Sequence, residues 1–173
     1  MAGTTHPETF VNLHCLVNGV SLNKKLTDCT PPKMKAKVEG VRYAGTDAEL
    51  DMDTGLEKLE FSLTGTGFID PIEELIGNPD IMSAQFEMRG AYRDVRGVVR
   101  SATIILRGKV IESDGGSWKP GDKGERKYAG TAAYYELMID GKTYHKIDPL
   151  NNIRIIAGTD MMEKVNQALG LPQ

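Results

Sequence analysis

Hydrophobic and polar residues alternate with a period of two along several stretches of this chain. Residues 59–64 set leucine and phenylalanine between glutamate, serine and threonine, and residues 83–92 and 98–111 repeat the pattern. Successive side chains of a β-strand point to opposite faces of the sheet, so this period predicts strands with one buried and one solvated face. We expect further strands at residues 33–38, 128–139, 142–147 and 151–156.

Turn signals fall between these strands. Asn18-Gly19 predicts a tight turn in a hairpin over residues 11–26, because both residue types tolerate the positive φ of a type I′ turn. Asp140-Gly141 gives the same signal later in the chain, and residues 93–97 are short enough to join another pair of strands. The spacing is typical of an antiparallel β protein rather than of alternating strands and helices.

Two segments carry helix signals. Residues 70–77 have an aspartate as a cap, a proline at the first helical position and a glycine after the end. Residues 160–169 are expected to form a C-terminal helix with Asp160 and Glu163 as a capping pair. The apolar residues of this second helix fall on one face, which comprises Met162, Val165 and Leu169.

These elements predict a single domain over residues 1–173, long enough to bury a core. The expected fold is mainly β, with sandwich-like or barrel-like antiparallel sheets, one short internal helix and a C-terminal helix. Residues 1–8 are expected to be flexible. Residues 39–56 and 112–127 are too long for plain turns, so we expect loops or arms with a function of their own.

Charge and composition narrow the classes of function. The formal net charge is −3, which argues against a surface that holds nucleic acid through many phosphate contacts. The start of the chain lacks the features of a signal peptide, and no stretch approaches the roughly 20 apolar residues of a membrane span. We therefore expect a protein made in the cytoplasm without a membrane partner. Cys15 and Cys29 are expected to be buried free thiols.

Catalytic chemistry has little support in the sequence. His6, His14 and His145 have no spacing that forms a recognised triad or metal cluster. We find no phosphate-binding glycine motif and no nucleophile elbow. The sequence therefore indicates a protein that is not an enzyme, with no cofactor and no metal.

Four carboxylates alternate with other residues within the arm at residues 39–56. A period of two places them on one side of an extended segment. Their spacing matches the first, third, fifth and seventh positions of a calcium loop, but such a loop needs glycine at its sixth position and glutamate at its twelfth. This chain has Met52 and Lys58 there. We interpret the carboxylates as a solvated or partner-facing row, formed by Asp47, Glu49, Asp51 and Asp53.

The arm at residues 112–127 contains the single tryptophan, Trp118. Its lysines and arginine would suit a site for single-stranded nucleic acid, but four acidic residues of the same segment dilute the positive charge. Large aromatic side chains are favoured at the centres of protein interfaces. We therefore interpret Trp118 as an anchor for a neighbouring protein.

Strand edges suggest how such a domain assembles. A small β domain leaves edges that must be covered, charged or closed, and joining them to identical neighbours in a ring removes them. A cyclic ring has two unlike faces, so rings can stack head to tail into a tube. These features permit a tube protein but do not single one out.

Six segments, taken in order and spacing, resemble the major tail tube proteins of contractile-tailed phages and of related phage-tail-like bacteriocins. The resemblance extends from about Asn12 to Leu171 and rests on the joint order of the segments rather than on one motif. The segments are Pro32-Lys33-Met34, Lys58 to Gly65 (KLEFSLTG), Trp118-Lys119-Pro120-Gly121, Tyr134 to Gly141 (YYELMIDG), Ile147 to Asn152 (IDPLNN) and Gly158 to Leu171.

The resemblance implies a tail-tube-like fold whose strands join those of sister subunits in a homohexameric ring lined by a continuous β-barrel. Rings would stack into a tube inside a contractile sheath, with the tape-measure protein and then DNA in transit through the lumen. The implied partners are further copies of the chain, the sheath protein, and the baseplate and tube terminator proteins. The implied location is the virion tail, reached from the host cytoplasm during assembly.

The resemblance also implies roles for particular residues. Residues 33–60 match a long hairpin that reaches an adjacent subunit or ring, and the loop with Trp118 lies at a subunit contact. The contact candidates are Val41, Tyr43, Leu50, Met52, Trp118, Lys119 and Pro120. An acidic lumen would keep DNA from sticking because like charges repel. The lumen-facing candidates are Asp47, Glu49, Asp51, Asp53 and Glu60.

Two alternatives remain at this point. Within the same architecture, the chain is the tube subunit of a bacteriocin or secretion particle that carries no DNA. From a different class, it is a monomeric β-barrel ligand-binding protein, which predicts a closed apolar pocket.

Overall fold

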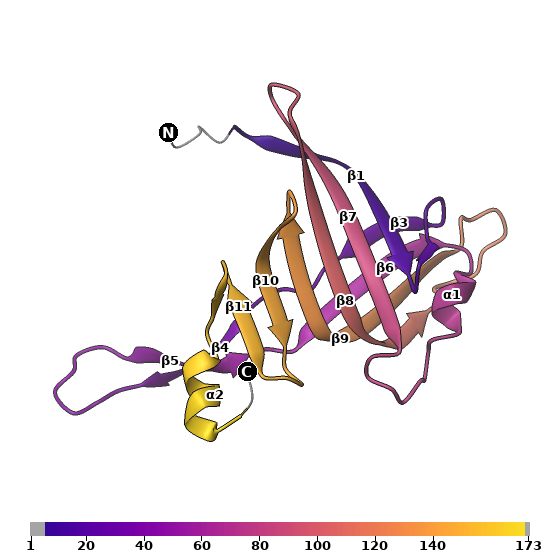
Figure 1. Cartoon of the computed structure of the whole chain (residues 1–173). Coiled ribbons are helices and arrows are strands. Elements are labelled where there is room, and N and C mark those ends of the chain that lie inside the picture. Colours follow the sequence, from indigo (N-terminus) through magenta and orange to yellow (C-terminus); the bar gives the residue numbers. More distant parts are fainter. Residues whose placement is uncertain (1–5, 172–173) are drawn as a thin grey trace.

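The computed structural model describes residues 6–171 and is an antiparallel β structure with two short helices (Figure 1). The predicted fold class is therefore confirmed. The strands are β1 (Glu8–Val17), β2 (Val20–Ser21), β3 (Leu26–Thr30), β4 (Ala36–Val41), β5 (Leu50–Leu56), β6 (Leu59–Thr66), β7 (Ala84–Asp94), β8 (Val99–Asp114), β9 (Glu125–Ile139), β10 (Lys142–Asp148), β11 (Ile153–Ile156) and β12 (Thr159–Asp160). The helices are α1 (Asp70–Glu73) and α2 (Glu163–Leu169).

The main sheet branches at β9. Along one edge, β9 pairs with β8 from Lys127 to Ile139. Along the other edge, its first part pairs with β6 and its last part pairs with β10. One branch continues through β10, β11 and β12, and the other consists of β6 and β3. The long β8–β9 ladder thus carries two smaller sheets that leave it in different directions.

The core lies where the β6–β3 branch faces the inner side of β1, β7 and β8. In β6 and β7 the alternating residues predicted to be buried are buried, and Leu63 and Phe86 have no exposed surface. In β8 only Leu106 of the predicted set is fully buried, while Ala102 and Ile104 are partly exposed. The rings of Phe61 and Phe86 are 4.8 Å apart, which joins the branch to the main sheet. Cys15 of β1 is also fully buried. The result is a curled, barrel-like body.

The predicted turns have local causes and are confirmed. Asn18 and Gly19 have φ values of 46° and 80°, and Asp140 and Gly141 have 50° and 78°. These residues occur in turns because asparagine, aspartate and glycine tolerate the left-handed region best. The strand after Asn18-Gly19 is short, however, since β2 has two residues and β3 begins only at Leu26.

Strands β4 and β5 form a separate two-stranded sheet, the β4–β5 hairpin (Ala36–Leu56). It leaves the body at the lower left of Figure 1, so most of its length has no other part of the chain beside it. The first predicted strand of this region, residues 33–38, was placed too early, because residues 33–35 are not in a strand.

Both helices are shorter than predicted. Helix α1 ends at Glu73, and its N-cap is Ile69 with no side-chain cap, so Asp70 lies inside the helix. Helix α2 begins at Glu163, because Asp160 belongs to β12. The Asp160 carboxylate accepts hydrogen bonds from the backbone N–H groups of Arg154 and Met162. Cross-strand pairing thus replaced the capping box predicted from sequence.

The second predicted loop is shorter in the structure than expected from the sequence. Strand β8 runs to Asp114 and β9 starts at Glu125, so the arm predicted at residues 112–127 is a loop of residues 115–124. At the start of the chain, the segment expected to be flexible reaches residue 8, and Glu8 is the first residue of β1. His6 and Pro7 precede this strand, and residues 1–5 lie outside the described residues.

Candidate assembly surfaces

The β4–β5 hairpin exposes large apolar side chains that nothing in its own chain covers. The exposed fractions are 53% for Tyr43, 55% for Leu50 and 48% for Met52. The Tyr43 hydroxyl donates to the Met52 sulfur at 3.3 Å, which joins the two arms of the hairpin near its tip. Val41, the fourth hairpin contact candidate, is half-buried. Such apolar surface costs free energy in water, and its burial would stabilise a complex.

The two faces of this hairpin differ in chemistry. Val41 is opposite Leu50 in the register, and Gly40 is opposite Asp51. Opposite residues of an antiparallel pair share a face, and neighbours along a strand alternate. One face therefore carries Leu50 and Met52, and the other, the acidic face, carries Asp51 and Asp53.

Of the two other carboxylates in the predicted acidic row, Glu49 lies on the acidic face, whereas the direction of Asp47 is not fixed by the strand. A side-chain oxygen of Glu49 lies 3.1 Å from where a Cβ of Gly40 would stand, which places Glu49 on the acidic face. Asp47 lies in a bend near the tip, so strand alternation does not fix its direction. The acidic face is thus formed by Glu49, Asp51 and Asp53.

Asp53 anchors the root of the hairpin to the body. The Arg154 guanidinium of β11 donates to its carboxylate at 2.6 Å, and the Gly55 N–H donates at 2.8 Å. The hydrogen bond from Arg154 and then that from Gly55 lower the pKa of Asp53. Asp53 is therefore a bound structural carboxylate in this chain, a role that sequence spacing had not indicated.

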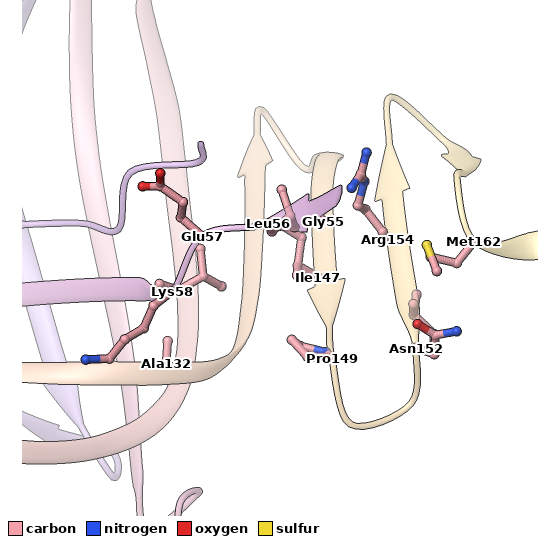
Figure 2. A pocket seen from close by; sticks show the side chains of 12 residues that line it. Gly55, Leu56, Glu57, Lys58, Ala132, Ile147, Pro149, Asn152, Arg154 and Met162 are labelled. Carbon is pink, nitrogen blue, oxygen red and sulfur yellow. The ribbon is translucent and has the colours of Figure 1, made fainter. Parts of the chain in front are cut away.

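A hollow of about 310 Å³ lies beside this anchor (Figure 2). Leu56 and Ile147 contribute apolar walls, while Arg154 and Met162 come from the segment that follows β10. Glu57 and Lys58 are exposed, so the hollow is open to solvent at the hairpin root. It is not the closed apolar pocket expected of a ligand-binding barrel.

The loop at residues 115–124 forms a second apolar surface. Trp118 is 78% exposed and its ring lies edge-on to that of Phe68, with 6.3 Å between centroids. The Arg126 guanidinium lies over the Phe68 ring, 4.2 Å from its centroid. Arg126 also forms an ion pair with Glu73 at 3.0 Å. Phe68, Trp118 and Arg126 line a hollow of about 420 Å³, and Lys119 and Pro120 line it as well. The contact candidates of this loop therefore lie together on one exposed surface.

A third exposed surface was not predicted from sequence. The β7–β8 turn carries Val95, which is 72% exposed, together with exposed Val98 and Val99. Arg93 and Arg96 flank these valines and are exposed as well. Three valines in and beside a tight turn were a visible signal, because turns usually contain polar residues.

The C-terminal helix departs from the predicted burial pattern. Val165 and Leu169, two residues of its predicted apolar face, are exposed, and the buried residue of α2 is Asn166. The Asn166 side chain exchanges hydrogen bonds with Asn152 in the turn before β11. A buried polar side chain needs such partners, and here they fix the rotation of the helix.

The remaining candidate residues are dispersed. Glu60 lies on the exposed side of β6 and pairs with Lys58 at 2.9 Å. His14 contacts the Ser21 hydroxyl at 3.1 Å across the first hairpin. Within residues 6–171, no three histidine, cysteine or acidic side chains are grouped so as to hold a metal ion. No helix of the same residues is long and apolar enough to cross a membrane.

The two cysteines meet inside the body. The Cys29 thiol of β3 lies within hydrogen-bonding reach of the Cys15 thiol of β1. That contact, and then burial, raise the pKa of Cys29. Both thiols are free, as predicted, but only Cys15 is fully buried and Cys29 is partly exposed.

The sequence is similar to known tail tube proteins. The family model for phage tail tube protein FII matches residues 7–170. The tail tube protein of Escherichia phage P2 is 30% identical over 171 residues, which cover 95% of this chain and 98% of that protein. The major tail tube protein of Serratia phage KSP20 is 31% identical over 159 residues, which cover 90% of this chain and 91% of that protein.

Solved structures share the fold at much lower identity. The sheath/tube terminator of an extracellular contractile injection system, PVC, in its extended state has a TM-score of 0.58 and 9% identity, over 78% of this chain and 99% of that chain. The tube terminating cap of the anti-feeding prophage has a TM-score of 0.58 and 9% identity, over 80% of this chain and 99% of that chain. At this identity the likeness concerns the fold alone.

Proposed function

This chain belongs to the phage tail tube protein FII family, and we propose that copies of it form hexameric rings that stack into the inner tube of a contractile phage tail. The observation that carries the proposal is the β4–β5 hairpin, which projects from the body with Tyr43, Leu50 and Met52 about half exposed. A two-stranded ribbon is marginal by itself in water. A sister subunit would supply the missing cover.

Open strand edges support the same proposal. Among residues 6–171, β3 pairs only with β6, and the outer edge of β1 has a partner only at Leu16 and Val17. Exposed edges offer unpaired N–H and C=O groups to other strands. Ring closure through these edges would satisfy them while leaving the core of each subunit unchanged.

The Trp118 surface is a separate candidate contact. The loop between β8 and β9 lies on the opposite side of the body from the β4–β5 hairpin in Figure 1. Its residues Trp118, Lys119 and Pro120 line a hollow together with Phe68. We assign this surface to a contact between subunits. An exposed tryptophan that gains a partner typically contributes strongly to binding.

The lumen would hold the tape-measure protein and then conduct DNA. We propose Glu60 as a lumen-facing carboxylate, because it lies on the solvated side of β6 rather than in the core. A lumen with negative charge repels DNA and allows it to slide. Glu60 pairs with Lys58 and Asp53 pairs with Arg154, so each would add less negative charge to the lumen than an unpaired carboxylate.

The proposed partners outside the tube are the sheath, the baseplate and the tube terminator. The structures that share the fold are parts of contractile injection systems, which supports a contractile tail over other tube architectures. The curated relatives are proteins of phages, which favours a DNA-conducting virion tail over a particle without DNA. We place the assembled protein in the virion tail and its assembly in the host cytoplasm.

Purified full-length protein tests this function directly. Sedimentation velocity at several concentrations, with electron microscopy of the same samples, should show rings at intermediate and tubes at high concentration. Protein that stays monomeric at every concentration, also when its neighbouring tail proteins are added, would overturn the proposal.

A further inference from the structure

The tip of the β7–β8 turn is positively charged and apolar at the same time. Arg93 and Arg96 are exposed, and among residues 6–171 neither forms an ion pair. The nearby carboxylate of Asp94 is occupied, since it accepts hydrogen bonds from the backbone N–H groups of Arg96 and Val98 at 2.8 Å. These bonds fix the turn and leave the two guanidinium groups available.

The acidic face of the β4–β5 hairpin has the complementary character. At its root, Asp53 already binds an arginine of the body, Arg154. Farther out, Glu49 and Asp51 continue the same face, and neither has an ion-pair partner among the described residues. Asp53, the carboxylate nearest the body, thus has an arginine partner within the chain. Glu49 and Asp51 have no ion-pair partner among the described residues.

The two surfaces cannot meet within one chain. The β7–β8 turn is at the top of Figure 1, whereas the β4–β5 hairpin leaves the body at the lower left. A contact between them must therefore join two copies. Because the surfaces are unlike, the contact is heterologous, and such contacts close into rings or continue as stacks.

We propose that the β7–β8 tip of one copy docks on the β4–β5 hairpin of another copy, with Arg93 and Arg96 paired to Glu49 and Asp51. The inference rests on the proposed self-assembly and names the surfaces that meet. Oppositely charged patches steer association and exclude wrong registers. Val95 and Val98 at the tip would at the same time bury apolar surface against Val38, which is opposite Asp53 in the register and is exposed on the acidic face.

Two charge-reversed variants of the full chain test the pairing. The tip variant is Arg93→Glu with Arg96→Glu, and the hairpin variant is Glu49→Lys with Asp51→Lys. Each brings like charges together, so the concentration needed for assembly should rise at least about tenfold for either variant alone. Both pairs of residues are exposed, so the melting temperature should stay near that of the wild type.

Mixing the two variants gives the sharpest readout. In an equimolar mixture, the acidic tip of one variant meets the basic hairpin of the other, and the reverse contact is matched as well. Assembly should therefore return close to the wild-type level by sedimentation and electron microscopy. Loss to single rings in the separate variants places the contact between rings, and loss to monomers places it within a ring; both support the pairing.

A matched control reverses two exposed lysines elsewhere, with Lys142→Glu and Lys164→Glu, and should assemble like the wild type. The pairing is overturned if the tip and hairpin variants assemble as the wild type does, or if their mixture stays unassembled. Wild-type assembly of the separate variants is also what we would expect if Glu49 and Asp51 faced only the lumen. Failure of the wild type itself to assemble would count against the tube function instead.

Discussion

Arg154 and Asp53 lie 101 residues apart in sequence, yet the Arg154 guanidinium donates to the Asp53 carboxylate at 2.6 Å. The contact joins β11 to the root of the β4–β5 hairpin. The side chain of Arg154 is 20% exposed, whereas that of Asp53 is 45% exposed. The body thus holds one end of an arm whose other end is free to contact another subunit.

Asp53→Asn should loosen the hairpin without unfolding the body. The pKa of Asp53 is lowered in the folded state, so its contribution to stability is present above the usual aspartate pKa, about 3.9, and is lost as pH falls through the lower folded value. Hydrogen exchange across residues 36–56 should be faster in the variant at neutral pH. In the wild type, the same acceleration should appear only on acidification.

The global melting temperature of Asp53→Asn should change by less than about 4 °C, because an exposed ion pair contributes little to stability. Asp122→Asn, in the loop at residues 115–124, removes an exposed carboxylate with no ionic partner among the described residues and serves as the control. Unchanged exchange in the hairpin of Asp53→Asn would contradict the anchoring role.

Gly130→Ala should destabilise the folded domain by about 1–3 kcal/mol, as overpacking of a core does. A Cβ at Gly130 would stand 2.6 Å from the Lys109 carbonyl oxygen and 2.7 Å from a ring carbon of Phe61. Both neighbours belong to packed strands and have little room to move. Chemical denaturation measured by circular dichroism gives the free energy of unfolding.

Gly40→Ala is the matched control for this substitution. Its Cβ would meet only the end of the Glu49 side chain, at 3.1 Å, and that carboxylate can rotate away. The free energy of unfolding should change by no more than about 0.5 kcal/mol. Equal effects of the two glycine substitutions would mean that contact with Phe61 does not restrict residue 130.

Cys29 should make the protein less stable at alkaline pH. The nearby Cys15 thiol and burial raise the pKa of Cys29 in the folded state, so its neutral form is favoured there. The unfolded chain loses this proton near pH 8.5, and stability should then fall by at most about 1.4 kcal/mol per pH unit. Denaturation at pH 7, 8.5 and 9.5 under reducing conditions measures the slope.

Cys29→Ser should flatten this slope between pH 8.5 and 9.5, whatever its effect at pH 7. The comparison stays below about pH 10, where the tyrosines of the unfolded chain lose their protons. Above that pH, Tyr134 would add a slope of the same sign, because burial and a hydrogen bond to Glu136 raise its folded-state pKa to about 12. An identical slope in the wild type and in Cys29→Ser would show that the thiol is not responsible.

Trp118 offers an intrinsic probe of assembly. Its side chain is 78% exposed in the single chain, and the protein has one tryptophan, so the fluorescence reports on this position alone. If Trp118 lies at a subunit contact, its emission should shift to shorter wavelength and its quenching by acrylamide should fall as tubes form. Trp118→Ala should raise the concentration needed for assembly by about tenfold or more.

Tyr144→Ala provides a comparison for this substitution, because Tyr144 is a half-buried aromatic residue of β10 away from the loop at residues 115–124. Emission and quenching that stay constant through assembly would place Trp118 outside the contacts. That result would leave the hairpin contact unaffected, since the two surfaces lie on different parts of the body.

The sequence by itself determined the features whose causes are local. The alternation in β6 and β7 identified strands and their buried residues, and Asn18-Gly19 and Asp140-Gly141 marked turns through their tolerance of positive φ. The joint order of short segments indicated the tail tube family. None of these requires knowing which distant strands are neighbours.

Only the tertiary structure decided what depends on contacts between distant residues. The branching of the sheet at β9, the meeting of Cys15 with Cys29 and the anchoring of Asp53 by Arg154 join segments that no local pattern connects. The start of α2 was misjudged for the same reason, because Asp160 pairs with Ile155 in the sheet instead of capping the helix. Pairing between distant segments is set by how whole strands bury their apolar faces together, which a local period cannot specify.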